Sequence, residues 1–323
     1  MRILQGIVAA VFILSVHSIP YRGNRYLHFN QRPLLSSQRW SPASYSDEDP
    51  TSRIVGGTPA RSGQVSYQLY MKGQTSKGER YHCGAALVDE YNIQFAITAA
   101  HCVYDGYPHH SDAVDPKKVR IVAGEISLKT KSGREQYRTP HRIVMHENFK
   151  YDEDHPDDDI AIMFYRKAFT VNFYVQPIAL PDYLWAQPRK MTISGWGSTT
   201  PLPNLRDPDT LQVSQIDTLD NGICGHFYKW NPAAEAPQVT WKQICILDLN
   251  RNNGFCDGDS GGPGVAWNKT SSKLYLAGIG SYYLGDCGDK DRPAVYTRVS
   301  AYTDWIRSQV AEYIRLHLSV GGR

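Results

Sequence analysis

The sequence predicts an all-β protein with one amphipathic helix near its C-terminal end. From residue 54 onward, short apolar or alternating runs follow one another, separated by Gly, Pro, Asn and Asp. Runs of this length that are rich in Val, Ile, Tyr and Thr are typical of strands, and helical spacing is nearly absent before residue 302. The chain has 323 residues, of which 41% are hydrophobic and 21% charged, which is enough to bury a sizeable core.

The predicted strands and the predicted helix differ in the period of their apolar residues. Examples of strand-like runs are Ala85–Val88, Phe95–Ala99, Val119–Val122, Ile160–Phe164, Met191–Ser194, Leu274–Ile279 and Ala294–Val299. Between residues 302 and 318, apolar side chains recur every three or four positions, which predicts a helix with one buried face. No internal repeat of fixed period occurs.

The N-terminus predicts export. Met1-Arg2 precedes an apolar run that ends near residue 16, followed by small residues, a pattern that indicates a secretory signal peptide over residues 1–18. An N-terminal membrane anchor is the alternative, but the run is short for a bilayer and no stop-transfer pattern follows. Residues 19–53 are polar, contain four prolines and no cysteine, and are interpreted as a pro-segment that precedes a domain over residues 54–323.

Export makes disulfides the expected state of the six cysteines, with fifteen pairings open if all are bonded. They are Cys83, Cys102, Cys224, Cys245, Cys256 and Cys287. No Cys-x-x-Cys or clustered Cys/His spacing favours zinc. The net charge of +3 without a dense Lys/Arg run does not favour a nucleic-acid partner. Asn268-Lys269-Thr270 forms a glycosylation acceptor, consistent with a secreted protein.

The hexapeptide of residues 258–263, Gly-Asp-Ser-Gly-Gly-Pro, carries the chief chemical signal. A serine between glycines can lie on a sharp turn whose N–H groups converge, and a developing oxyanion requires such donors. Ser260 is therefore a candidate nucleophile. An ordinary Gly/Ser/Asp turn is the alternative interpretation.

A serine nucleophile requires a base and an acid that orients it. Among the eleven histidines, His101 directly follows an apolar strand and small residues and precedes Cys102, whereas the others lie mostly in polar or terminal contexts. Asp159 leads into another apolar strand and is expected to be buried with an imidazole partner. Asp157 and Asp158 are interpreted as a solvated acidic loop.

Seven motifs in order make the chain similar to the trypsin/chymotrypsin-type serine proteases. They are Arg53-Ile54-Val55-Gly56-Gly57, Thr98-Ala99-Ala100-His101-Cys102, Asp159-Ile160-Ala161-Ile162, Gln176-Pro177-Ile178-Ala179-Leu180-Pro181, Ser194-Gly195-Trp196-Gly197, Gly258 to Pro263, and Pro293-Ala294-Val295-Tyr296-Thr297-Arg298-Val299. The resemblance implies two antiparallel six-stranded β-barrels, over about residues 54–170 and 171–300, with the active site between them. It also implies a catalytic triad of His101, Asp159 and Ser260.

The same resemblance implies further roles. The N–H groups of Gly258 and Ser260 would form the oxyanion hole. Cleavage after Arg53 would free the amine of Ile54, which would pair with Asp259. The implied disulfides are Cys83–Cys102, Cys224–Cys245 and Cys256–Cys287.

The pocket that selects the residue before the scissile bond departs from the trypsin pattern. Gly254 stands where trypsin-like enzymes have aspartate, and Phe255 stands where a small residue is usual. The strand Ser281-Tyr282-Tyr283 and Ala294 are expected to form the walls. If Tyr283 and Phe255 narrow or block the pocket, it should favour small or modest apolar side chains over lysine or arginine. Two carboxylates, Asp257 and Asp286, could instead draw basic side chains to neighbouring subsites; solvated carboxylates are the preferred interpretation.

The sequence also bears on cofactors and on alternative functions. Glu125 and Glu135 match two carboxylates of the family's calcium loop, but the basic residues Lys129, Lys131 and Arg134 lie among them, and no metal or other cofactor is predicted. An α/β-hydrolase is disfavoured because its acid and histidine follow the serine. The prediction is a secreted, monomeric endopeptidase zymogen that meets protein or peptide substrates, an activating protease and protease inhibitors, and no membrane. A non-catalytic binding or regulatory relative is the alternative.

Overall fold

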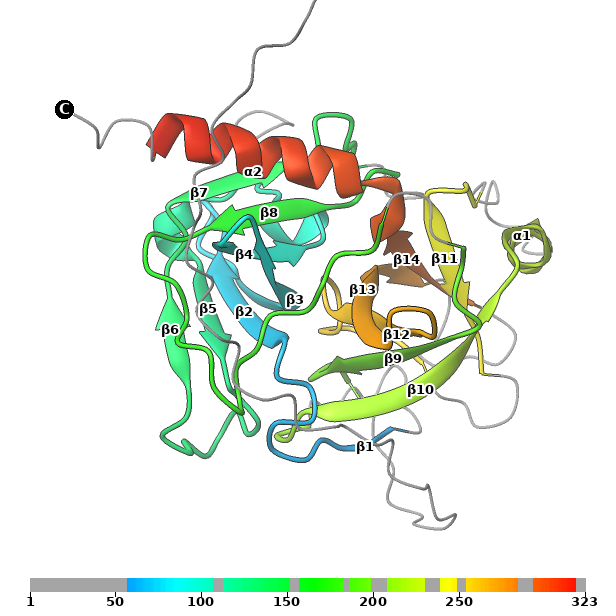
Figure 1. Cartoon of the computed structure of the whole chain (residues 1–323), viewed down its shortest axis with the longest axis horizontal. Helices are drawn as coiled ribbons and strands as arrows, with labels where there is room; N and C mark the ends of the chain where they lie inside the picture. Colours follow the sequence, from blue (N-terminus) through cyan, green and yellow to red (C-terminus); the bar gives the residue numbers. More distant parts are fainter. Residues whose placement is uncertain are drawn as a thin grey trace, which may run out of the picture. The chain divides into compact units, whose positions relative to one another are not determined.

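Most of the regular secondary structure of the described chain lies in two antiparallel β-sheets (Figure 1). The computed structural model describes residues 57–106, 113–151, 157–182, 186–198, 208–229, 239–248, 254–283 and 293–317. All of them belong to one compact unit, which runs from Asp49 to Arg323. The predicted signal peptide and pro-segment lie outside the described residues. Within the described ranges, no helix is both long enough and apolar enough to cross a membrane.

The first sheet has seven strands in the order β6-β5-β2-β3-β4-β8-β7 and curls on itself (Figure 1). Its strands are β2 (Gln68–Gln74), β3 (Arg80–Glu90), β4 (Ile93–Thr98), β5 (Arg120–Ala123), β6 (Gln136–Arg138), β7 (Arg142–Met145) and β8 (Ala161–Phe164). The end of β4 pairs with the start of β8, with Thr98 opposite Ala161. Residues that follow β4 and residues that precede β8 are therefore brought to the same edge.

The second sheet closes into a six-stranded barrel, because β9 pairs with both β10 and β12. Its strands are β9 (Lys190–Gly195), β10 (Gln212–Leu219), β11 (Gln243–Ile246), β12 (Pro263–Asn268), β13 (Lys273–Tyr283) and β14 (Ala294–Arg298), and β1 (Thr58–Pro59) pairs with β10. The predicted all-β class is confirmed, and the second half is one of the two predicted six-stranded barrels. The first half is a curled seven-stranded sheet and not a closed six-stranded barrel, since β6 and β7 at its two ends do not pair with each other among the described strands.

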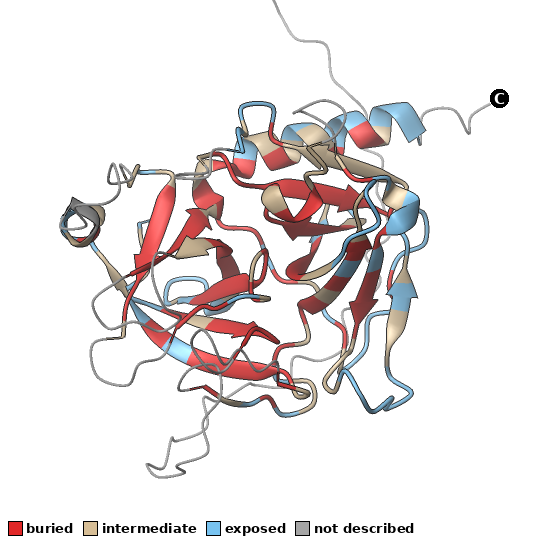
Figure 2. Ribbon diagram, turned by 180° about the vertical axis from the view of Figure 1, so that it is seen from behind, coloured by how far each residue is buried: buried red, intermediate tan, exposed pale blue. Residues whose placement is uncertain are grey.

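One large hydrophobic cluster extends across both sheets. It contains Phe95 and Ile97 of the first sheet together with Leu276 and Ile279 of the second and Trp196, which directly follows β9. Strands β3 and β4 contact β12 and β13 across this junction. Buried residues accordingly run continuously along the facing strands of both sheets (Figure 2). A site built at this junction receives side chains from two rigid scaffolds.

The predicted C-terminal helix is present as α2 (Thr303–His317). Its buried residues include Ile306, Val310 and Tyr313, whose three- and four-residue spacing places them on one face. The ring of Tyr313 stacks on Phe164 of β8 with 4.3 Å between centroids. The helix therefore packs against the first sheet, as Figure 1 shows for β7 and β8.

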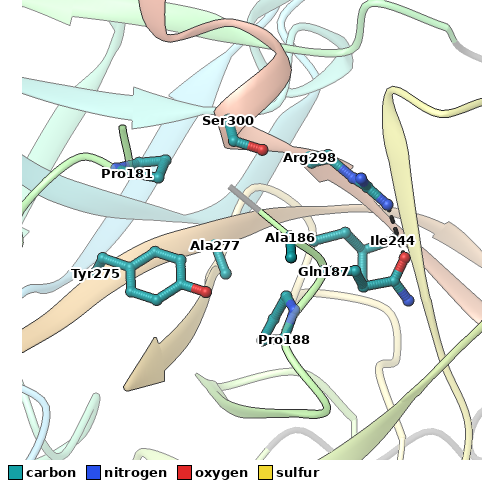
Figure 3. A pocket seen from close by; sticks show the side chains of 9 residues that line it. All are labelled: Pro181, Ala186, Gln187, Pro188, Ile244, Tyr275, Ala277, Arg298 and Ser300. Carbon is teal, nitrogen blue, oxygen red and sulfur yellow. Dashed lines mark hydrogen bonds between the residues drawn. The ribbon is translucent and has the colours of Figure 1, made fainter. Parts of the chain in front are cut away.

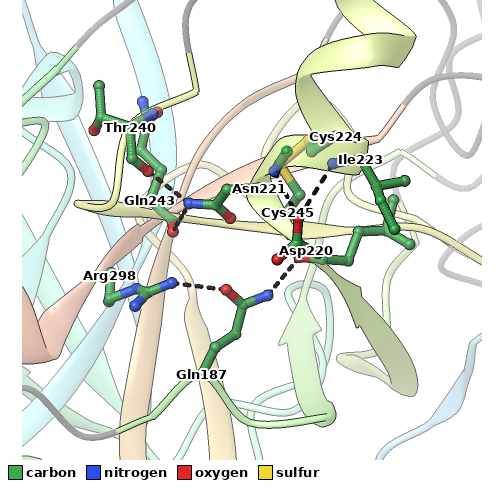
Figure 4. The surroundings of a disulfide bond; sticks show 11 residues. Gln187, Asp220, Asn221, Ile223, Cys224, Thr240, Gln243, Cys245 and Arg298 are labelled. Atoms are coloured by element: carbon green, nitrogen blue, oxygen red, sulfur yellow. Dashed lines mark hydrogen bonds between the residues drawn. A yellow bond between two sulfur atoms is a disulfide. The ribbon is translucent and has the colours of Figure 1, made fainter.

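A shorter helix, α1 (Asn221–Lys229), was not predicted from the sequence. The Asp220 side chain caps it by accepting hydrogen bonds from the N–H groups of Gly222 (2.8 Å) and Ile223 (3.3 Å). The Cys224–Cys245 disulfide ties α1 to β11 (Figure 4). Ile223 is 53% exposed, and Cys224 is the one buried residue among the α1 side chains that the structure describes, so the cap and the disulfide contribute most to holding this short helix in place.

Three short 3₁₀ turns complete the described elements. They are η1 (His101–Val103), η2 (Pro116–Lys118) and η3 (Val299–Ala301). The predicted Cys83–Cys102 disulfide is present and joins β3 to η1, and the predicted Cys224–Cys245 disulfide is present as well. The third predicted pair includes Cys287, which lies outside the described residues.

Candidate active site

His101 and Asp159 meet at the edge shared by β4 and β8. Nδ1 of His101 lies 2.8 Å from Oδ2 of Asp159, and the backbone N–H of His101 donates to Oδ1 at 2.9 Å. Because a carboxylate can only accept, the proton of this pair lies on Nδ1 when Asp159 is ionised. The second ring nitrogen, Nε2, is thereby left with its lone pair, as a general base requires.

Burial and the charge of the partner shift the pKa of His101 in opposite directions, and the same holds for the pKa of Asp159. Burial alone would lower the pKa of His101, but the charge of Asp159 and the hydrogen bond between them raise it above its ordinary value. Burial alone would raise the pKa of Asp159, whose side chain has no exposed surface, but the bonds from His101 and Ser281 hold it below its ordinary value. The pair therefore favours a carboxylate beside an imidazole that can take a proton.

Two donors from the second barrel fix Asp159 from the other side. The Ser281 hydroxyl donates to Oδ2 of Asp159 at 2.6 Å, and the Thr297 hydroxyl donates to its backbone carbonyl at 2.8 Å. Ser281 was expected only as part of the pocket wall, so its contact with the acid was missed by sequence reasoning. No local pattern could have revealed it, because 122 residues separate the two partners.

The predicted nucleophile lies on a tight turn packed against the first sheet. The carbonyl of Ser260 accepts a hydrogen bond of 2.7 Å from the N–H of Gly84 in β3. Gly261 has a positive φ of 74°, and a Cβ there would overlap Thr98 and Gly84, so only glycine fits. This contact brings the turn to the end of β4, three residues before His101.

The hydrogen bond between nucleophile and base is not formed in this structure. Among the described contacts, Nε2 of His101 has Cys102 Sγ at 3.6 Å and no hydrogen bond to Ser260. In free enzymes such bonds are often long and tighten only when substrate binds. The N–H groups of Gly258 and Ser260, the expected oxyanion donors, likewise donate to no backbone oxygen within the described chain.

Asp259 is buried beneath this turn. Its Oδ1 accepts a hydrogen bond from the N–H of Gly197 (2.8 Å) and its Oδ2 one from the N–H of Cys256 (3.2 Å). A Cβ at Gly195 or at Gly197 would overlap the Asp259 carboxylate. The two glycines of the 194–197 motif are thus explained by their close approach to this side chain. Its expected partner Ile54, with Arg53, lies outside the described residues.

The predicted specificity residues form one cluster below the nucleophile turn. Phe255 is 1% exposed, and its ring makes edge contacts with Tyr283 (5.8 Å) and Tyr296 (5.6 Å). Gly254 and Ala294 are buried near it. The Tyr283 hydroxyl donates to Asp257 Oδ1 at 2.8 Å. Asp257 is exposed, as expected, but its carboxylate already has a tyrosine partner.

The interpretation of Asp158 as part of a solvated acidic loop is wrong. Asp158 is 6% exposed rather than solvated, and its carboxylate accepts hydrogen bonds from Lys242 Nζ (2.7 Å) and the Tyr302 hydroxyl (2.9 Å). The error arose because these partners lie 84 and 144 residues away, so the acidic run looked unpaired. Asp157 is half-exposed at 44%, and Lys242 Nζ lies 4.0 Å from its Oδ2.

The candidate calcium loop brings carboxylates together and also supplies donors to them. Burial raises the pKa of Glu125, and the nearby charges of Glu135 and Asp209 add to this effect. Glu135 accepts hydrogen bonds from the N–H and hydroxyl of Ser132 and the N–H of Gly133, at 2.6, 2.7 and 3.0 Å. The absence of a calcium ion from this loop stays a prediction.

Two other predicted features can be located. Asn268 ends β12, and its side-chain oxygen accepts hydrogen bonds from the N–H groups of Thr270 (2.8 Å) and Ser271 (3.1 Å), which places the acceptor motif in the turn before β13. Asp286 lies outside the described residues. In the described chain, one group of three potential metal ligands occurs, formed by Cys83, Cys102 and His101, and its cysteines are bonded to each other.

A small pocket on the second barrel contains none of the candidate catalytic residues (Figure 3). It is lined by Pro181, Ala186, Gln187, Pro188, Ile244, Tyr275, Ala277, Arg298 and Ser300. A hydrogen bond of 2.7 Å from Arg298 Nη2 to the side-chain oxygen of Gln187 spans one side of it. This pocket is therefore separate from the candidate catalytic residues.

Comparisons with known proteins agree with the geometry at the junction of the two sheets. Residues 54–306 match the Trypsin family model. The chain is 38% identical to Trypsin-1 of Astacus astacus over 79% of its own length and 99% of that protein. It is 30% identical to Trypsin-1 of Salmo salar, over 84% and 96% of the two chains, and 31% identical to Trypsin I-P1 of Gallus gallus, over 82% and 92%.

Proposed function

Because the chain belongs to the trypsin family of serine endopeptidases, we propose that Ser260, His101 and Asp159 are its catalytic triad. Ser260 Oγ attacks the scissile carbonyl while His101 Nε2 takes its proton, and the same imidazole then protonates the leaving amine. Water hydrolyses the acyl-enzyme by the reverse sequence. The 2.8 Å contact between His101 Nδ1 and Asp159 Oδ2 is the observation that chiefly supports this assignment.

The oxyanion of the tetrahedral intermediate is proposed to bind the N–H groups of Gly258 and Ser260. The positive φ of Gly258, 93°, supports this role, because a turn of that shape directs neighbouring N–H groups to one side. Loss of one such donor typically costs about a hundredfold or more in kcat.

The substrate is proposed to carry a small or modest apolar side chain before the scissile bond. Gly254 provides no carboxylate to pair with lysine or arginine, and Phe255 fills the space between Tyr283 and Tyr296 with a ring. The hydrogen bond from Tyr283 to Asp257 further restricts access to the pocket. It also engages the Asp257 carboxylate, which could otherwise have attracted a basic side chain.

The enzyme is further proposed to be a secreted zymogen. The signal-like residues 1–18, the cysteine-free residues 19–53 and the Arg53–Ile54 boundary support export followed by cleavage after Arg53. The freed amine of Ile54 would then pair with Asp259. Asn268 would carry the glycan. Its substrates would be proteins or peptides, and its partners an activating protease and protein inhibitors.

Active-site titration after cleavage at Arg53 tests the assignment. When an ester titrant acylates Ser260, the cleaved wild-type protein is expected to release one equivalent of the ester's alcohol leaving group, and Ser260→Ala none. Ser271→Ala, an exposed serine in the turn after β12, serves as the matched control and should titrate like the wild type. A burst that survives in Ser260→Ala would refute the assignment of the nucleophile.

A further inference from the structure

A buried ion pair lies next to the catalytic acid and is not used by the proposed reaction. The Asp158 side chain is 8% exposed, and its Oδ1 lies 2.7 Å from Lys242 Nζ. The same oxygen accepts a hydrogen bond of 2.9 Å from the Tyr302 hydroxyl. His146 Nδ1 lies 3.9 Å away. A carboxylate buried to this degree is stable only because donors surround it.

The donors come from three separate parts of the fold. Lys242 directly precedes β11 of the second barrel, Tyr302 directly precedes α2, and His146 follows β7 of the first sheet. The backbone of Lys242 is itself tied to the barrel, because its carbonyl accepts a hydrogen bond from the N–H of Arg298 in β14. One carboxylate therefore joins both halves of the protein and the C-terminal helix.

A short hydrogen-bonded turn of the backbone connects Asp158 rigidly to Asp159. Asp158 has a φ of 55°, in the left-handed region, which aspartate tolerates better than most residues. The N–H of Ile160 donates to the carbonyl of Asp158 at 2.8 Å and closes a three-residue turn centred on Asp159. The directions of the two neighbouring side chains are thus coupled: one faces Lys242 and Tyr302, and the other faces His101 and Ser281.

We propose that Asp158, held by Lys242 and Tyr302, is a positioning residue that aims the carboxylate of Asp159 at His101. It touches neither substrate nor nucleophile and acts only through its neighbour. This inference rests on the proposed triad.

The charged groups around Asp158 show which cation compensates its negative charge. Lys242 and His146 face Asp158, with Asp157 and Glu147 close by. Burial lowers the pKa of His146 despite the attraction of Asp158, so this imidazole is neutral at neutral pH. Lys242 is therefore the cation that compensates Asp158.

The pH profile of catalysis reports on the position of Asp159. Asp159 is the charged group that raises the pKa of His101, through its charge and through its hydrogen bond. A displaced Asp159 would let the pKa of His101 fall, so the acidic limb of kcat/KM would move to lower pH while the maximum rate falls. A residue that supports only folding would change neither quantity at a temperature well below Tm.

The test compares activated wild type with Asp158→Asn, Lys242→Met and Lys242→Arg. Asparagine tolerates the left-handed backbone and still accepts from Tyr302, so Asp158→Asn removes the charge with little steric change. We expect kcat to fall about tenfold with KM changed less than about twofold, since small misplacements of catalytic groups cost rate. The acidic limb should shift downward by a few tenths of a pH unit. Lys242→Met should act in the same direction, and Lys242→Arg should restore most of the rate.

A second Asp–Lys pair provides the control. Asp217 and Lys190 join β10 to β9 at the surface, 3.2 Å apart, with side chains more than half exposed. Asp217→Asn should change neither kcat nor the acidic limb. If Asp158→Asn lowers Tm but leaves kcat and the limb as in the wild type, the positioning role is wrong. Active-site titration separates the two proposals, because a protein that titrates normally with unchanged Asp158→Asn kinetics refutes only this one.

Discussion

Replacing Phe255 with alanine tests whether its ring determines which substrates the enzyme accepts. The ring is 1% exposed and packs against Tyr283 and Tyr296. A Cβ at Gly280 of β13 would clash with its Cε2 atom, so the ring lies directly on the backbone of that strand. Phe255→Ala removes the ring and leaves the surrounding backbone intact.

The structure sets the size of two opposing effects. Loss of a fully buried phenylalanine ring costs about 3–5 kcal/mol of unfolding free energy. A substrate side chain that enters the freed volume gains about 1.5–3 kcal/mol from burial. That gain corresponds to about ten- to a hundredfold in kcat/KM, since 1.36 kcal/mol is tenfold in rate. Phe255→Ala should therefore be less stable than the wild type and more active on large apolar residues.

The assay uses peptides that differ only in the residue before the scissile bond, namely alanine, leucine, phenylalanine or arginine. Wild type should cleave the alanine peptide best, and Phe255→Ala should gain on leucine and phenylalanine but not on arginine, because Gly254 supplies no anion. Phe255→Leu keeps most of the apolar volume and is expected to gain little. A folded Phe255→Ala with unchanged preference, or a wild type that prefers arginine, would refute the reasoning.

Three further predictions concern the triad, the Asp259 environment and acid stability. Ser281→Ala removes the 2.6 Å bond to the buried Asp159 carboxylate, and since bonds to charged groups contribute about 1.5–3 kcal/mol, Tm should fall by several degrees. Measured well below Tm, kcat should fall at least tenfold, and a kcat equal to that of the wild type would contradict this role. Gly197→Ala, whose Cβ would overlap the buried carboxylate beside the nucleophile, should abolish active-site titration, whereas Gly225→Ala in α1, where nothing lies within 4 Å, should titrate normally. Burial lowers the pKa of His146 in the folded state, so protonation of this imidazole favours the unfolded state. Stability should therefore be lost as pH falls below about 6.5, the ordinary pKa of histidine. In thermal unfolding between pH 6.5 and 5, the Tm of His146→Phe should fall less steeply than that of the wild type.

The strands could be predicted because their signal is local. Runs such as Phe95–Ala99 and Met191–Ser194 lie almost entirely within β4 and β9, since a strand that is covered on both faces must be apolar throughout. The C-terminal helix was predicted to within one residue at each end because its apolar residues recur at helical spacing, and Ile306, Val310 and Tyr313 share a buried face. The α1 helix was not predicted, because it is only nine residues long and is held by the Asp220 cap and a disulfide, which its periodicity does not reveal.

The site could be predicted only in part, for a related reason. His101, Asp159 and Ser260 each follow or precede an apolar strand or a glycine turn, and their motifs mark them individually. The residues that hold them in place carry no such mark. Ser281 was noticed only as a wall residue, and Asp158 was interpreted as solvated, although both make short hydrogen bonds beside the acid.

The local conformation at Asp159 explains why this acid depends on distant residues. The three-residue turn from Asp158 to Ile160 is one hydrogen bond long and contains a left-handed residue, so local forces alone would hold it weakly. Its geometry persists because Lys242 and Tyr302 hold the side chain on one side and Ser281 holds the other. Since those three residues come from the second barrel and the start of α2, the acid is in position only when both halves of the protein are docked. For the proposed triad, catalytic competence would thereby be coupled to assembly of the whole fold.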